Sequence, residues 1–179
     1  MTGKLAIKMA KLLGAARVVA AGRNPTILST LHMHGADATI RLDMPAQELN
    51  DAFAREASQS GFQVVIDYVW GRPAEAFLAA ITSKGFAHIK SETRFVQIGE
   101  SAGPTISLPA AVLRSTALTI LGTAGIPPRN ILMDAWQKVM SLAASGKVHV
   151  DTERVALANI ENAWERDQQG SRFVIMPQP

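Results

Sequence analysis

The sequence predicts an α/β protein with a Rossmann-like, doubly wound parallel sheet, and three observations predict it. Short apolar runs alternate with segments of helical periodicity along the 179-residue chain, a pattern typical of parallel strands joined by crossover helices. A continuous β-branched run at 64–66 suits a strand that is covered on both faces. Glycines follow several strand-like runs, at the sheet edge where such folds bind ligands.

Up to residue 61 the pattern predicts three helices and two strands. Apolar residues three and four apart predict the helices, and each is followed by a glycine that can end it. The strands are short apolar runs, and Asn24-Pro25 breaks the first. In chain order these elements are a helix at 5–13 before Gly14, a strand at 17–21, a helix at 26–34 before Gly35, a strand at 38–42 and a helix at 47–58 before Gly61.

From residue 62 the strands become clearer and the helices longer. The β-branched run around Val65 marks a strand, and Pro127-Pro128 precedes a long helix whose apolar side includes Val139. In chain order the expected elements are a strand at 62–69, a helix at 71–82, strands at 94–98 and 118–121 with a short helix at 109–114 between them, a helix at 129–144 closed by Gly146, a strand around Val148, a helix at 155–167 and a strand at 173–176.

The chain opens directly into a helix, whereas a doubly wound fold first supplies a strand and a glycine-rich turn. That first strand lies at the middle of the sheet, so its neighbours are expected to lose hydrogen-bonding partners here. A longer natural protein, a swapped strand or a rearranged sheet would each restore the pairing. The sequence leaves these three alternatives open.

The composition suits a packed domain: 47% of the residues are hydrophobic and 18% are charged. The absence of cysteine excludes disulfides and thiolate metal sites and is compatible with a reducing cytoplasm, the expected location. The net charge of +3 is dispersed and accompanies no nucleic-acid recognition motif. No apolar stretch is long enough for a membrane span. His32 and His34 are badly spaced for a helical metal site, and no serine has a visible base partner.

Taken in order, these segments resemble the medium-chain dehydrogenase/reductase superfamily, in its zinc-type alcohol dehydrogenase and quinone oxidoreductase branches. The resemblance extends over nearly the whole chain. The segments that carry it are 2–15 for the first helix of the nucleotide domain, 17–23 for its second strand, 31–37 for a Leu-x-x-x-Gly-Ala-Asp element, 64–67, 96–99 and 120–122 for later strands, and 161–164 with 170–177 for the closing helix and strand.

The resemblance implies the carboxyl-terminal, nucleotide-binding part of an oxidoreductase. Residues 1–145 would form a partial dinucleotide-binding domain, and 146–179 a strand-helix-strand tail that packs on a catalytic domain outside this sequence. The reaction implied is hydride transfer between nicotinamide and an alcohol, carbonyl or quinone, with any general acid or zinc in the other domain. With no zinc ligands visible, the quinone-reductase branch is favoured. Family members commonly dimerise through an edge strand, here 116–124.

Arg23 is the most informative candidate residue. It follows the second strand of the fold, where an acid would bind the ribose of NAD and an arginine suits the extra phosphate of NADP. NADPH is therefore favoured over NADH, although Arg23 is alternatively a solvated loop residue. Gly3 would let phosphate approach the start of the first helix, or is a flexible terminus.

Three further strand ends are assigned to the cofactor by resemblance. The stretch 67–70 would lie against the adenosine, Gly99 and Glu100 near the nicotinamide, and residues 121–123 would offer backbone groups to its carboxamide. The alternatives are a packing role for Trp70 and ordinary turn chemistry elsewhere. The complete predicted set is Gly3, Gly22, Arg23, Asn24, Tyr68, Val69, Trp70, Gly99, Glu100, Leu121, Gly122 and Thr123.

Two rival functions remain compatible with the pattern. One is a non-catalytic, truncated module that binds the nucleotide or only dimerises. The other is a different doubly wound enzyme, such as an adenosylmethionine-dependent methyltransferase. That class also expects an acid after the second strand, so Arg23 disfavours it.

Overall fold

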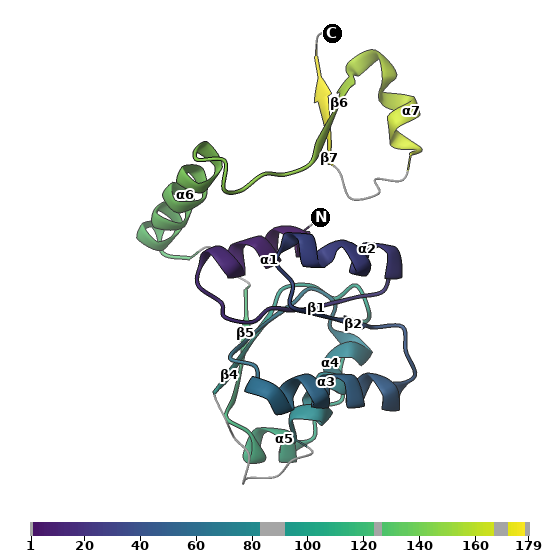
Figure 1. Ribbon diagram of the computed structural model, residues 1–179, viewed down its shortest axis with the longest axis vertical. Helices are drawn as coiled ribbons and strands as arrows, with labels where there is room; N and C mark the ends of the chain where they lie inside the picture. The colour runs from purple at the N-terminus through teal and green to yellow at the C-terminus, as the bar shows by residue number, and fades with distance from the viewer. Residues whose placement is uncertain (1, 83–91, 124–126, 167–171, 178–179) are drawn as a thin grey trace. The chain divides into compact units, whose positions relative to one another are not determined.

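The computed structural model describes residues 2–82, 92–123, 127–166 and 172–177 (Figure 1). The chain divides into two compact units. One comprises Val19–His32 and Asp37–Gly125, and is called here the sheet unit. The other comprises Met1–Val18, Met33–Ala36 and Ile126–Pro179.

The sheet unit alternates strands and helices in the order that the sequence predicts. The helix expected at 26–34 is divided, because its last turn, Leu31–His34, tightens into a 3₁₀ helix. The elements are β1 Val19–Gly22, α2 Pro25–Thr30, β2 Ala38–Arg41, α3 Ala46–Ser60, β3 Val64–Asp67, α4 Gly71–Thr82, β4 Thr93–Gln97, α5 Ala110–Ser115 and β5 Leu118–Gly122.

The strands of the sheet unit form two separate parallel ladders. In the first, β1 pairs with β2, with Val19 opposite Ala38. In the second, β4 lies between β3 and β5, so that Phe95 has Val65 on one side and Ile120 on the other. All of these pairings are parallel, which confirms the predicted α/β class with a parallel sheet.

Helices cover both faces of the first ladder and one face of the second. Leu49 of α3, Phe77 of α4 and Phe95 of β4 are among the residues of one buried cluster that also takes in Ile40 of β2. On the opposite face of the first ladder lies α2, since a Cβ built on Gly22 would be 3.3 Å from the Leu28 side chain. Figure 1 shows α2 and α3 on opposite sides of β1 and β2.

The order of the five strands follows from these faces. Crossovers between parallel strands are right-handed. When two successive connecting helices lie on opposite faces of the sheet, the second connection therefore adds its strand in the opposite direction along the sheet. The connection through α2 places β2 on one side of β1, and the connection through α3 places β3 on the other. These connections indicate the order β2-β1 and then β3-β4-β5, with no hydrogen-bonded pairing between β1 and β3 among the described residues. The break falls where the sequence predicts that a middle strand is lacking.

The expectation that the run at 64–66 is covered on both faces is wrong. Val65 points toward the cluster, but the side chains of Val64 and Ile66 are 49% and 45% exposed. Both lie on the face away from α4, and β3 has a strand neighbour on only one side within the described residues. Burial on two faces requires a covering layer on each face as well as an apolar sequence.

The other unit contains α1, the long helix α6 and a parallel pair of strands. The bounds are α1 Thr2–Leu12, α6 Arg129–Ala144, β6 Thr152–Ala156, a 3₁₀ turn at Leu157–Asn159, α7 Ile160–Trp164 and β7 Arg172–Met176. β6 pairs with β7, from Thr152 opposite Arg172 to Ala156 opposite Met176. The helices α1 and α6 match their expected positions.

Two expectations for the tail are wrong. No strand forms at Val148, because the amides of Lys147 and Val148 both donate to the Leu142 carbonyl and hold this segment in the turn after α6. The helix expected at 155–167 is shorter, since Val155 belongs to β6 and α7 begins only at Ile160.

Candidate functional site

The carboxyl ends of the parallel strands define one edge of the sheet unit. This edge, called here the carboxyl edge, consists of residues 22–24 after β1, 42–45 after β2, 67–71 at β3, 98–103 after β4 and 122–123 at β5. Eleven of the twelve predicted site residues belong to it or adjoin it at Leu121. Parallel α/β sheets bind their ligands at such an edge.

The turn after β3 is organised by a buried carboxylate. Asp67 is only 6% exposed, and its side-chain oxygens accept hydrogen bonds from the backbone N–H of Val69 at 3.0 Å and of Trp70 at 3.0 and 3.1 Å. Trp70 has a φ of 54°, which is unusual for a bulky residue. Its ring meets that of Phe95 edge-on, with the centroids 6.0 Å apart. The Asp67 carboxylate therefore fixes a turn that carries three predicted site residues, Tyr68, Val69 and Trp70.

The turns after β3 and β4 are in backbone-to-backbone contact. A Cβ on Gly99 would lie 2.6 Å from the Tyr68 carbonyl oxygen, and one on Gly71 would lie 2.6 Å from that of Ala102. The Ala102 amide donates to the Val69 carbonyl at 2.7 Å. Only glycine allows such an approach at these two positions. The structure thus brings together the predicted residues 68–70 with Gly99 and Glu100.

The end of β5 joins this group through Thr123, whose hydroxyl donates to the Gln97 carbonyl of β4 at 3.1 Å. Leu121 and Gly122 are exposed, and a Cβ on Gly122 would meet no atom within 4 Å. Among the described residues, nothing covers the backbone of Gly122.

The end of β1 is built differently. Asn24 caps α2, its side-chain oxygen accepting from the Ile27 amide at 3.1 Å. The Leu42 amide donates to the Gly22 carbonyl at 2.9 Å and so ties β1 to the turn after β2. Arg23 is exposed and makes no hydrogen bond or ion pair to any residue that the structure describes. Its guanidinium is free to bind an anion.

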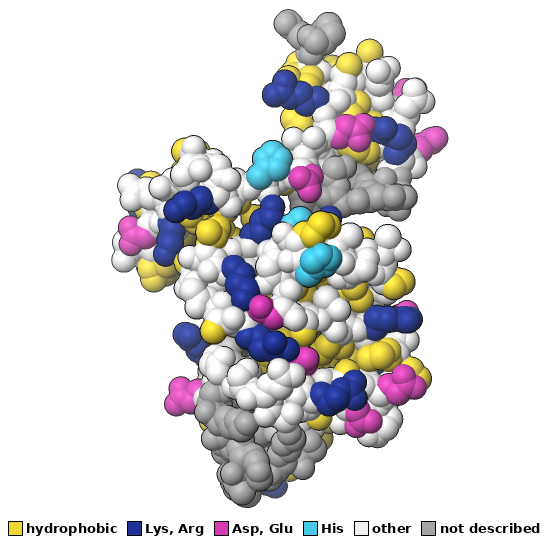
Figure 2. Space-filling view, in the orientation of Figure 1, with side chains coloured by type: hydrophobic (Ala, Val, Ile, Leu, Met, Phe, Trp, Pro, Cys, Tyr) yellow, Lys and Arg dark blue, Asp and Glu magenta, His cyan; other side chains and the backbone are white. Residues whose placement is uncertain are grey.

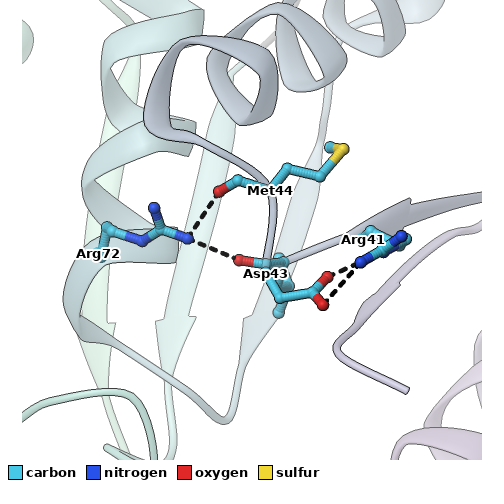
Figure 3. Close-up of polar contacts among 5 residues, drawn as sticks. Arg41, Asp43, Met44 and Arg72 are labelled. Atoms are coloured by element: carbon cyan, nitrogen blue, oxygen red, sulfur yellow. Dashed lines mark hydrogen bonds and ion pairs between the residues drawn. The ribbon is translucent and has the colours of Figure 1, made fainter. Parts of the chain in front are cut away.

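The turn after β2 contains residues that the sequence analysis missed (Figure 3). Arg72, at the start of α4, donates through Nη2 to the carbonyl oxygens of Leu42 at 3.0 Å and Met44 at 2.8 Å. Arg41 donates to both carboxylate oxygens of Asp43 at 2.9 and 2.7 Å. This bond lowers the pKa of Asp43 and raises that of Arg41. Arg72 escaped prediction because its partners are about thirty residues away in the sequence. For the turn after β3 the sequence does contain a signal, because an Asp at a strand end, here Asp67, favours a turn.

Gly3 stands apart from the other predicted residues. It belongs to the first turn of α1, in the other unit, and is exposed. A Cβ there would meet nothing within 4 Å. A glycine is therefore not required at this position by packing within the structure.

A shallow recess in the other unit is lined by residues that include Lys4, Lys8, His34 and Asp151. Burial, followed by the nearby Lys8 and Lys4, lowers the pKa of His34. None of the predicted cofactor residues lines this recess. We place the candidate site at the carboxyl edge instead, because that is where the strand-end glycines and the free arginine are found.

The distribution of charge and of possible metal ligands adds little to the location of the functional site. Figure 2 shows Lys and Arg side chains dispersed among acidic ones over the visible face. Among the described residues, no three His, Asp or Glu side chains gather into a possible metal site. In the same residues, no helix has the length and apolarity needed to cross a bilayer.

Comparison with known proteins agrees with this architecture. A family model described as zinc-binding dehydrogenase matches residues 2–145. No curated protein matches the sequence. Among solved structures, the chain is similar to AibC, with 20% identity and a TM-score of 0.76 over 99% of this chain and 46% of that one.

Two further structures are similar in fold. For the Escherichia coli quinone oxidoreductase complexed with NADPH, the identity is 20% and the TM-score 0.71, over 98% of this chain and 53% of that one. For an NAD-dependent alcohol dehydrogenase, the values are 22% and 0.69, over 96% and 46%. The chain therefore spans about half the length of these structures.

Proposed function

Because the chain belongs to the zinc-binding dehydrogenase family, we propose that it is the NADP(H)-binding part of an oxidoreductase. The proposed reaction transfers hydride between the nicotinamide ring and an alcohol, carbonyl or quinone. The choice of NADPH over NADH rests on Arg23, an exposed guanidinium at the end of β1 that has no partner among the described residues.

The position of Arg23 suits a ribose 2′-phosphate. In dinucleotide-binding sheets, the residue after this strand contacts the adenosine ribose: an acid accepts from its hydroxyls, and an arginine binds the additional phosphate. The planar guanidinium can bind phosphate through two parallel hydrogen bonds. Asn24 is less available for the ligand, because its side chain already caps α2.

The remaining residues of the carboxyl edge would hold the rest of the cofactor. The turn at Tyr68, Val69 and Trp70, fixed by Asp67, would lie against the adenosine part. Gly99 and Glu100 would lie near the nicotinamide, while residues 121–123 offer exposed backbone to its carboxamide. The cofactor would supply the hydride, and these residues would orient it.

The described residues do not fit a zinc site, in spite of the family's description. The chain has no cysteine, and no described His, Asp and Glu residues cluster as a ligand set would. We therefore assign no step to a metal held by these residues.

A thermal melt of the full chain with NADPH, NADH or adenosylmethionine tests the cofactor proposal. A ligand that binds only the folded state raises the midpoint, so we expect a rise with NADPH and a smaller one with NADH. No rise with either nicotinamide nucleotide on a cooperatively folding chain contradicts it. A rise with adenosylmethionine alone would indicate the methyltransferase class.

Replacing Arg23 sharpens this test. A charge-assisted hydrogen bond contributes about 1.5–3 kcal/mol, so Arg23→Gln should weaken NADPH binding roughly 10- to 100-fold and leave NADH binding nearly unchanged. The matched control is Arg55→Gln, an exposed arginine on α3 away from the carboxyl edge. Titration calorimetry measures both. Equal losses of affinity for NADPH and NADH would show that Arg23 does not bind the 2′-phosphate.

We also propose that two copies of the chain associate through β5. Among the described strands β5 pairs only with β4, so its outer edge is open, and its Leu121 side chain is 42% exposed. An open apolar strand edge favours pairing with another strand. Sedimentation should show a dimer that Ile120→Pro dissociates. The Ala117 carbonyl accepts from β4, so the alternation of the strand directs the Ile120 amide to the outer edge, where proline removes it. A monomeric native chain contradicts this proposal.

A further inference from the structure

An acidic residue lies beside the arginine that is proposed to bind the 2′-phosphate. Gly22 of β1 is in register with Arg41 of β2, and the Leu42 amide donates to the Gly22 carbonyl at 2.9 Å. Paired strands lie about 4.8 Å apart. Arg23, which follows Gly22, and Asp43, which follows Leu42, are therefore close neighbours at the carboxyl edge.

The turn after β2 holds the backbone of Asp43 from both sides. Arg72 donates through Nη2 to the carbonyl oxygens of Leu42 at 3.0 Å and of Met44 at 2.8 Å (Figure 3). These two residues stand directly before and after Asp43 in the chain. The position of the Asp43 backbone beside the end of β1 is thus fixed by hydrogen bonds.

A lone carboxylate at this place would oppose the binding of NADP(H). A phosphate monoester carries close to two negative charges at neutral pH. Like charges repel each other when they lie within one Debye length, which is about 8 Å at physiological ionic strength. An acid near the adenosine ribose is also the feature with which dinucleotide-binding sheets select NAD. Asp43 without a partner would therefore favour NADH.

Arg41 removes this obstacle by pairing with Asp43. Its Nε and Nη2 donate to the two carboxylate oxygens at 2.9 and 2.7 Å, the two-pronged geometry that suits a guanidinium. The pairing lowers the pKa of Asp43 and raises that of Arg41, so both groups are charged at neutral pH and the pair is neutral as a whole. Arg23, by contrast, has no partner among the described residues.

The exposure of this pair indicates that stability is not its main role. The side chains of Arg41 and Asp43 are 51% and 43% exposed, and ion pairs at such exposed places contribute little to folding. Their charges do act on a ligand that binds beside them, because the end of β1 lies on the neighbouring strand.

We propose that Arg41 is a positioning residue for cofactor selection: it neutralises Asp43 and so allows Arg23 to hold the 2′-phosphate of NADP(H). Arg41 acts through Asp43 and does not touch the phosphate, since its Nε and Nη2 are both engaged by the carboxylate. This inference rests on the proposed function, because it takes Arg23 as the phosphate-binding residue.

Titration calorimetry of the full chain with NADPH and NADH tests the inference, because these nucleotides differ only in the 2′-phosphate. Arg41→Gln leaves the Asp43 charge uncompensated. We expect this variant to bind NADPH roughly three- to tenfold more weakly at physiological salt and to bind NADH nearly as the native chain does. The loss should shrink at about 1 M salt, where the Debye length is only about 3 Å.

Two further variants separate neutralisation from other roles of Arg41. Asp43→Asn removes the negative charge and should tighten NADPH binding by a roughly similar factor. The double variant Arg41→Gln/Asp43→Asn restores a neutral turn and should regain most of the affinity that Arg41→Gln loses. If Arg41 contacted the phosphate directly, the double variant would stay as weak as Arg41→Gln.

Arg166→Gln is the matched control. Arg166 forms a similarly exposed ion pair with Glu153, at 2.6 Å and with side chains 51% and 46% exposed, and it belongs to the other unit. This variant should not change the ratio of the two affinities. Thermal melts of all variants should remain cooperative, which shows that changes in affinity do not arise from unfolding.

Several outcomes overturn the inference while the proposed function stands. They are a native chain that prefers NADPH together with an Arg41→Gln variant of unchanged preference, equal losses for NADPH and NADH, a double variant without recovery, or an equal change in Arg166→Gln. A native chain with no preference for NADPH overturns the phosphate-binding role of Arg23 itself, and this inference with it.

Discussion

The neighbouring strands β3 and β4 reverse the burial that their sequences suggest. β3 reads Val-Val-Ile-Asp and leaves Val64 and Ile66 largely exposed. β4 reads Thr-Arg-Phe-Val-Gln, yet its Phe95 is 1% exposed and its Thr93 is also buried. The difference lies in the face of the sheet, because Phe95 points toward the helical cluster, whereas Val64 and Ile66 lie on the opposite face, where Arg94 of β4 is exposed as well. The layer that covers a face, more than the apolar composition of the strand, decides how deeply its side chains are buried.

The largest expected effect of a substitution is at the centre of β4. The Phe95 ring contacts those of Phe77 and Trp70, with centroid distances of 5.7 and 6.0 Å. Phe95→Ala should lower the free energy of unfolding by about 3–5 kcal/mol. Ile66→Ala on β3 is the matched control and should cost about 1 kcal/mol or less. Urea unfolding measures both, and equal losses would contradict the comparison.

Next in size is the loss of the carboxylate that ends β3. Asp67→Ala would remove the acceptor for the Val69 and Trp70 amides and leave partly buried donors unpaired. The cost should be about 2–3 kcal/mol. Asp67→Asn retains one side-chain oxygen acceptor and should recover part of that loss. If alanine and asparagine are equally tolerated in thermal unfolding, the carboxylate does not hold the turn.

A smaller effect separates the ends of β4 and β5. Gly99→Ala places a methyl group 2.6 Å from the Tyr68 carbonyl oxygen, and the backbone shift that follows should cost roughly 1–3 kcal/mol. Gly122→Ala meets no atom within 4 Å and should change stability by about 0.5 kcal/mol at most. The same urea experiment tests the pair; an equally large loss at Gly122 would mean that β5 is packed more tightly than β4.

The smallest effect concerns the exposed pair after β2. The hydrogen bond from Arg41 holds the pKa of Asp43 below its ordinary value. Arg41→Gln should return that pKa toward normal in a carboxyl NMR titration, whereas Arg72→Gln, which removes a more distant charge, should move it less. Because the folded-state pKa is lowered, the pair stabilises above the unfolded-state pKa, and its contribution disappears as pH falls through the folded-state value. An unchanged Asp43 pKa in Arg41→Gln would contradict this assignment.

The sequence was sufficient for what depends on local spacing. The order of elements in the sheet unit, the bounds of α6 and the break in the sheet all follow from periodicity and from the strand order of the fold class. The sequence located the predicted cofactor residues only by their position at the ends of strands, and their roles stay predictions. Arg23 lies at a strand end, as the sequence predicted. The sequence could not show that its guanidinium has no partner among the described residues.

What escaped prediction depends on contacts between distant segments or on backbone detail. Val148 has the composition of a strand, but the Leu142 carbonyl holds it in the turn after α6. The exposure of Ile66 reflects its place on the face of β3 away from the helical cluster. Arg72 looks like any exposed helical arginine until α4 and the turn after β2 are brought together. The φ of Trp70 depends on Asp67 and on its bridge to Gly103.

The hydrogen bonds of Arg72 also bear on the order in which the protein folds. They join residues 28 and 30 positions apart, which closes a chain segment containing α3, β3 and the start of α4. Closing a loop of this length costs only modest entropy, and α3 inside it packs against α4, which continues beyond it. We expect this helical pair to form early in folding, and the two-stranded ladder of β1 and β2 to open first on unfolding.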